Sequence, residues 1–263
     1  MKHVILVVLA ALILIPMFLL GYSQEQQEQL GYLKEGPLKW NEWRRDKRPK
    51  NIDFNLCNFS NASFNSINLN SVSLKAAIFY KADLSYAKLR EANLEAADLQ
   101  YANVYNADLF SANLLGANMM GANLSRANLG ETDMTYARLN ECKLFKADLE
   151  NAKLYEADLE RVDLRYANLT YSNLARAKLF KADLRFAILN NAILIDAKLT
   201  GANLTGADLT RANFSNVDLT AVTFTSNTIF KKATLAGARI QKKWQQFIYS
   251  QDVVNFSKII WVD

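Results

Sequence analysis

Carboxylate and amide side chains recur every five residues along most of this 263-residue chain, each between a small residue and a central apolar residue. Regular rows of Asp and Asn could hold metal ions on successive rungs or pair as catalytic carboxylates. The same slot, however, also holds Lys88, Arg138, Lys153 and Ile188, so Asp and Asn are preferred there and not required. We therefore expect these residues to lie on a solvated outer face and to bond the nearby backbone at corners.

No other group of residues in the sequence has the spacing of a catalytic, phosphate-binding or metal-binding motif. The single histidine, His3, lies inside an apolar N-terminal segment. Neither a glycine-rich phosphate loop, a metal-spaced cluster nor a nucleophile elbow can be found. We predict no catalytic residue, no cofactor and no metal, and hence no enzyme.

A period of five residues determines how these side chains must be positioned. Counting in fives from Phe54 to Phe224, all 35 central positions are Leu, Phe, Met or Val, and the residue two before each is Ala, Val, Ile, Cys, Ser or Thr, most often Ala. Positions two apart in an extended chain face the same side, so both point inward. In an α-helix, five residues advance about 500°, so the central positions would not share a face. A short strand plus a corner therefore predicts an all-β solenoid with four sides and twenty residues per coil.

These repeats, for example Ala82 to Tyr86 and Ala87 to Glu91, resemble those of the pentapeptide-repeat family. The resemblance covers Ile52 to about Ile240 and implies a right-handed quadrilateral β-helix. The segment Leu38 to Arg44 also resembles the Trp-Asn-x-Trp-Arg segment that precedes the first repeat in bacterial members. The chain is thus similar to a bacterial member that is exported or membrane-anchored.

The two cysteines occupy the small inward slot of this solenoid. Cys57 and Cys142 are a little over four coils apart, or about 20 Å along the axis at strand spacing. A disulfide needs Cα atoms within about 7 Å, so the two cannot pair. We interpret both as small buried fillers.

We divide the chain into a transmembrane anchor or signal peptide (1–23), a linker and N-terminal cap (24–50), the solenoid (51–240) and a C-terminal cap (241–263). Pro37 should open a short helix, with Leu38 beside Trp40 and Trp43 on one packed face. After Phe224 the repeat slips by one residue, which indicates a bulge or loop. Phenylalanine at the central positions of the repeats near both ends of the solenoid should fill and close the ends of the core. The C-terminal apolar residues could cap the last coil or form a homodimer seam: Trp244, Phe247, Ile248, Phe256, Ile259, Ile260 and Trp261.

The apolar run Val4 to Leu20 predicts targeting to a membrane. Its seventeen residues reach the lower limit for a transmembrane span, and Gly21 to Ser23 would also serve as a signal-cleavage site. Lys2 precedes the run, and Glu25, Glu28 and Glu35 with only Lys34 follow it, which favours an N-terminus inside and a solenoid outside the cytoplasm. A cleaved signal, giving a periplasmic or secreted protein, is the alternative.

The net charge of +5 belongs to the two ends of the chain, because residues 51–226 carry 17 basic and 19 acidic side chains. Residues twenty apart should stack on one side, and the side centred on Val104, Leu124, Leu144, Leu164 and Leu184 collects basic and aromatic residues. We call this set the basic–aromatic strip: Tyr105, Arg126, Lys143, Phe145, Lys146, Arg165, Tyr166, Arg185 and Phe186. Its composition is that of a docking surface for an anionic surface or an acidic protein patch. Alternatively, Phe and Tyr stack there only because exposed ladders favour such pairs.

These observations predict a non-catalytic scaffold, membrane-tethered or exported, whose rigid solenoid presents a surface to an unknown protein or anionic partner. The family resemblance implies an alternative, a DNA-mimicking inhibitor or protector of DNA gyrase. Such relatives rely on a strongly acidic cytosolic rod, whereas this rod is near neutral. The same balance argues against nucleic acid as a partner.

Overall fold

The computed structural model describes residues 23–263. The predicted anchor or signal peptide, with its apolar run from Val4 to Leu20, lies outside the described residues. Among the helices of residues 23–263, none has the length and apolar character that a membrane span requires.

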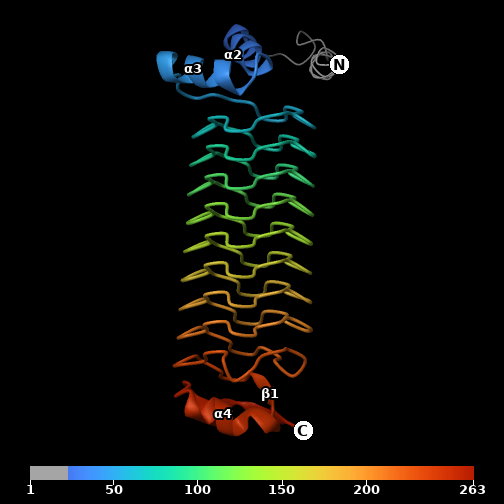
Figure 1. Cartoon of the computed structure of the whole chain (residues 1–263), viewed down its shortest axis with the longest axis vertical. Coiled ribbons are helices and arrows are strands. Elements are labelled where there is room, and N and C mark those ends of the chain that lie inside the picture. The colour runs from blue at the N-terminus through green and yellow to red at the C-terminus, as the bar shows by residue number, and fades with distance from the viewer. Residues whose placement is uncertain (1–22) are drawn as a thin grey trace.

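The repeats form one straight column of stacked coils (Figure 1). Parallel bridges join residues twenty apart, as in the series Asp83, Asn103 and Asn123. The ladder bonds run in both directions from each coil: Leu84 N donates to Asn103 O at 2.7 Å, and Asp83 N donates to Ala62 O at 2.8 Å. The predicted four-sided β-helix is confirmed.

The core is a continuous column of the small and central residues. Nearly every inward position from Ile52 to Ile240 is buried, including Cys57 and Cys142. Aromatic rings fill both ends, as predicted: Phe59 packs 5.2 Å from Phe79 near the start, and Phe224 packs 5.3 Å from Phe230 near the end. These larger side chains close the column where the next coil is missing.

Nearly every corner up to Asn216 holds a residue in the left-handed region of backbone space. Tyr86, Arg126 and Lys146, for instance, have φ of 59°, 60° and 58°. This conformation is unfavourable for residues with a side chain, so other interactions must hold it. The corner residue's own amide supplies one, since Tyr86 N donates to Tyr105 O of the next coil at 2.9 Å. The corner conformation therefore depends on hydrogen bonds to the next coil. These bonds also fix the backbone from which the outer side chains project.

The recurring Asp and Asn residues lie on the outside and bond the corner backbone. Asp83 Oδ1 accepts from the amide of Ser85 at 3.1 Å, and it also accepts from Asn103 Nδ2 of the next coil at 2.9 Å. Similar bonds repeat along the column, for example from Thr170 N to Asn168 Oδ1 at 3.1 Å. The predicted structural use of this slot is confirmed.

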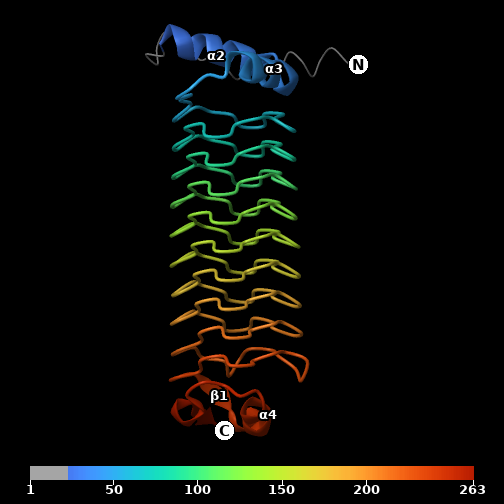
Figure 2. The same cartoon turned by 90° about the vertical axis from the view of Figure 1, so that its left-hand side faces the viewer.

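Two helices, α2 (Gln24–Lys34) and α3 (Pro37–Lys47), cover the N-terminal end of the column (Figure 2). Ser23 and Gln26 form a capping box at the start of α2, which lies where a linker was expected. Trp40 and Trp43 of α3 are buried as predicted. The prediction that Leu38 packs beside them is wrong, because its side chain is 80% exposed. Leu30 and Leu33 of α2 fill the cap instead.

The C-terminal tail closes the other end of the column. After the strand β1 (Arg239–Gln241) the chain forms η2 (Lys242–Trp244) and α4 (Gln245–Ser250), then η3 (Phe256–Lys258) and β2 (Ile260–Val262). Strand β2 pairs parallel with β1, with Arg239 opposite Ile260.

The tail caps its own solenoid, since Ile248 and Ile259 are buried and Trp244 packs 4.5 Å from Phe224. Ile260, which was expected among the capping residues, is instead exposed. The predicted slip after Phe224 is confirmed, because Asp208 bridges Ile229, twenty-one residues away. A homodimer through this tail stays a prediction.

Candidate docking surface on the solenoid

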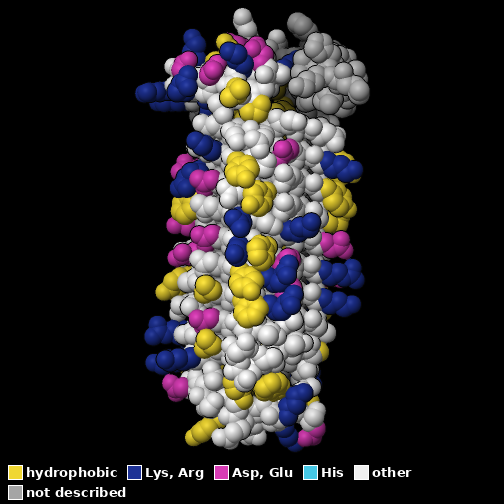
Figure 3. Space-filling model, in the orientation of Figure 1, with side chains coloured by type: hydrophobic (Ala, Val, Ile, Leu, Met, Phe, Trp, Pro, Cys, Tyr) yellow, Lys and Arg dark blue, Asp and Glu magenta, His cyan; other side chains and the backbone are white. Residues whose placement is uncertain are grey.

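The nine residues of the basic–aromatic strip occupy outer slots on one side of five successive coils. The backbone ladder fixes their order, because Arg126 N donates to Phe145 O at 2.9 Å and Lys146 N donates to Arg165 O at 3.0 Å. One coil further, Tyr166 N donates to Arg185 O at 3.1 Å. Figure 3 shows hydrophobic and basic side chains gathered in a column along the middle of one face.

Three aromatic rings of the strip form a continuous stack. Phe145 meets Tyr166 edge-on at 5.7 Å between ring centroids, and Tyr166 stacks on Phe186 at 5.1 Å and 15°. The side chains of Tyr166 and Phe186 remain 48% and 43% exposed. The stack ends over Gly206, where a Cβ atom would lie 2.6 Å from the Phe186 ring. The glycine thus leaves room for the last ring to lie flat.

Tyr105 does not join this stack. Its ring packs edge-on against Tyr86 at 5.7 Å, and Ser125 separates it from Phe145 along the column. Sequence reasoning did not include Tyr86, although its corner slot and the twenty-residue register would have placed it at this end of the strip.

Two of the five cations in the strip are neutralised by carboxylates of the same face. Arg165 Nε lies 2.8 Å from Asp163 Oδ1, and Arg185 Nη2 lies 2.7 Å from Asp183 Oδ2. The hydrogen bonds from Arg165 hold the pKa of Asp163 below its usual range, so this carboxylate stays charged. These arginines therefore add little net positive charge to the surface.

The other three cations, Arg126, Lys143 and Lys146, form no ion pair with any side chain of residues 23–263. Lys146 Nζ lies 5.4 Å from the centroid of the Phe145 ring and 5.9 Å from that of Tyr166. The uncompensated positive charge is thus concentrated on two neighbouring coils, directly beside the aromatic stack. This arrangement can bind an anionic group next to a flat apolar one.

The described residues offer little for covalent or metal chemistry. No group of three His, Cys, Asp or Glu side chains within residues 23–263 could hold a metal ion. Cys142 Sγ donates to Met119 O at 2.8 Å, and burial raises the pKa of its thiol to about 12. A thiol with that pKa is protonated at neutral pH and is a poor nucleophile.

Comparison with known proteins identifies the repeat. The family of pentapeptide repeats matches this chain with 8 copies over residues 52–95, 87–126, 122–161, 157–194 and 187–225. No curated protein sequence matches the chain significantly.

Solved structures show the same repeat. HetL, a pentapeptide repeat protein from the cyanobacterium Nostoc, is 32% identical over 75% of this chain and 87% of its own, with a TM-score of 0.56. HetL is involved in the regulation of heterocyst differentiation. QnrB1, a plasmid-mediated fluoroquinolone resistance protein, is 16% identical over 76% of this chain and 97% of its own, with a TM-score of 0.47.

The matches span most of the coils whose bridges, left-handed corners and buried small residues are described above. Sequence profile and structure thus agree on the repeat unit, and the chain belongs to the pentapeptide-repeat family.

Proposed function

We propose that this protein is a non-catalytic scaffold whose basic–aromatic strip docks an acidic segment of a partner protein. The observation that supports this most directly is that Arg126, Lys143 and Lys146 form no ion pair within residues 23–263, and that Lys146 lies 5.4 Å from the Phe145 ring and 5.9 Å from the exposed Tyr166 ring. Carboxylates of a partner would pair with the cations, and its apolar or aromatic side chains would pack on the rings.

The rigidity of the surface favours docking. The outer slots are held by ladder bonds on both sides: Lys143 N donates to Ala122 O of the preceding coil at 3.0 Å, and the adjacent Leu144 N donates to Asp163 O of the following coil at 2.7 Å. The backbone therefore loses little conformational freedom when a partner binds, which reduces the entropic cost of association. Nothing in this role requires a reaction at the strip.

A test is to select a random peptide library on the full chain and to measure the affinity of the enriched peptides. We expect enrichment of acidic residues near aromatic or aliphatic ones, and weaker binding as salt is raised. The triple variant Arg126→Glu, Lys143→Glu, Lys146→Glu should bind these peptides at least about tenfold more weakly, because each pairing becomes a like-charge contact.

The matched control reverses three exposed cations elsewhere on the column, Lys88→Glu, Arg138→Glu and Arg211→Glu, with the same change in net charge. It should retain affinity. Equal losses in both variants, or enriched peptides without acidic residues, would exclude the strip as the docking surface.

A DNA-mimicking action on gyrase is not favoured by the charges. Residues 51–226 hold 17 basic and 19 acidic side chains. Many of the acidic side chains already form ion pairs with Lys or Arg, as Glu141 does with Arg161 of the next coil at 3.5 Å. A DNA mimic needs a dense, unpaired acidic surface.

The location of the scaffold is a further part of the proposal, supported by the apolar run from Val4 to Leu20. Membrane and soluble fractions of expressing cells, with mass determination of the N-terminus, should yield a full-length chain in the membrane that external protease cuts. A chain beginning near Gln24 would support a cleaved signal. An intact cytosolic chain would rule out both forms of export.

A further inference from the structure

Two lysines face each other across neighbouring coils on a different side of the column from the strip. The ladder places Lys178 opposite Lys198, so the two backbone positions are about 4.8 Å apart. Like charges directly opposite one another destabilise a sheet. The acidic counterpart, Asp163 opposite Asp183, is compensated on both coils by Arg165 and Arg185, whereas in the lysine pair only Lys178 has a carboxylate within ion-pairing distance among residues 23–263, Asp158 at 3.8 Å.

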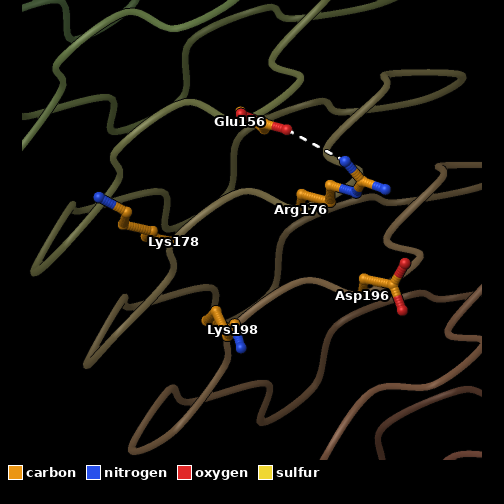
Figure 4. A pocket seen from close by; sticks show the side chains of 5 residues that line it. All are labelled: Glu156, Arg176, Lys178, Asp196 and Lys198. Atoms are coloured by element: carbon orange, nitrogen blue, oxygen red, sulfur yellow. Dashed lines mark hydrogen bonds and ion pairs between the residues drawn. The ribbon is translucent and has the colours of Figure 1, made fainter.

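The lysines line a shallow surface pocket of about 420 Å³, together with Glu156, Arg176 and Asp196. In Figure 4 the ammonium groups of Lys178 and Lys198 point away from each other, as like charges do, and Arg176 reaches toward Glu156. The pocket thus carries three cations on two successive coils.

The acidic neighbours compensate this charge incompletely. Glu156 is engaged by Arg176 at 3.3 Å, and Asp158 lies 3.8 Å from Lys178 Nζ. Asp196 accepts a hydrogen bond from Asn216 at 3.1 Å. Within residues 23–263, Lys198 has no carboxylate within ion-pairing distance.

We propose that Lys178 and Lys198 together bind a tetrahedral oxyanion, a phosphate or sulfate group, with Arg176 at its side. Lysine side chains on the surface rotate freely, so both ammonium groups can turn toward one anion placed between them. A doubly charged oxyanion would convert the repulsion between the two lysines into a shared attraction. The proposal concerns a different side of the column and does not depend on the strip.

The test titrates the full chain with inorganic phosphate and, separately, sulfate at constant ionic strength, with chloride as the reference ion. We expect saturable binding by calorimetry, and at saturation a rise in the melting temperature of about 2–4 °C over chloride. Lys178→Gln and Lys198→Gln should each weaken binding at least about fivefold, because one of two shared charges is lost. Asp196→Asn should strengthen it, because a repelling carboxylate is removed.

Lys153→Gln is the matched control, since this lysine occupies the same slot of its repeat but lies opposite Asp133, at 3.5 Å. It should leave anion binding unchanged. Lys198→Gln should also keep or raise the melting temperature in chloride, which a merely structural lysine would not do. Binding that chloride reproduces, or that Lys153→Gln weakens equally, would overturn the site.

Discussion

Replacing Phe79 with alanine should lower the free energy of unfolding by about 3–5 kcal/mol. The Phe79 side chain is 0% exposed and packs 5.2 Å from Phe59 and 6.4 Å from Phe64. The surrounding coils cannot collapse into the vacated space, because the backbone is tied on both sides. Phe79 N donates to Asp98 O at 2.6 Å, and Phe59 N donates to Ile78 O at 2.7 Å. The cavity should therefore remain, and the cost should lie near the upper end of this range.

The measurement is urea unfolding of the wild-type and variant chains, followed by circular dichroism. Phe180→Ala is the matched control, because it removes the same side chain from an outer slot that is only partly buried. We expect a loss of about 1 kcal/mol or less there, as is usual for substitutions outside the core. Similar losses at the two positions would show that the aromatic column does not stabilise this end of the solenoid.

The second large effect is expected at the N-terminal cap, where Trp40→Ala should cost about 3–5 kcal/mol. The Trp40 side chain is fully buried, and its ring lies 5.0 Å from Trp43 and 5.7 Å from Phe54. Its Nε1 donates to Asn68 O at 2.7 Å, so the substitution also leaves this carbonyl without its donor. Removal of the ring should detach the cap and expose the end of the core.

Hydrogen exchange can distinguish a detached cap from general unfolding. In Trp40→Ala, the amides of α3 and of the first coil should exchange faster, whereas those near Leu144 should keep their protection. Leu38→Ala is the control on the same helix, and its exposed side chain should contribute less than about 0.5 kcal/mol. Uniform loss of protection along the whole column would contradict a local capping role.

Much of this architecture could be predicted from sequence because the repeat is local. A five-residue unit fixes which side chain points inward, so the buried column, the outer Asp and Asn slots and the inward position of both cysteines all followed from counting. The one-residue slip after Phe224 was visible in the same way. The strip residues could be grouped by face, because twenty residues make one coil.

The ends of the column could not be predicted equally well, because no period governs them. Helix α2 lies where a linker was expected, and Leu33 of α2 packs in the cap where Leu38 had been placed. Which apolar residue covers an exposed core depends on the path of the chain across it, and only the tertiary structure defines that path.

The surface charges were likewise predictable only in part: their placement followed from the sequence, but their ion pairing did not. The sequence by itself determined that five cations lie on one face of the solenoid, since a fixed period sets the direction of every side chain. Only the tertiary structure decided that Arg165 and Arg185 are paired within that face, while Arg126, Lys143 and Lys146 have no ion pair among the described residues. It also revealed the pocket that Lys178 and Lys198 line, although the twenty-residue register alone would have made these two lysines neighbours. The physical reason is that ion pairing depends on side-chain conformations across stacked coils, and these are set by neighbours in space and not by position in the repeat.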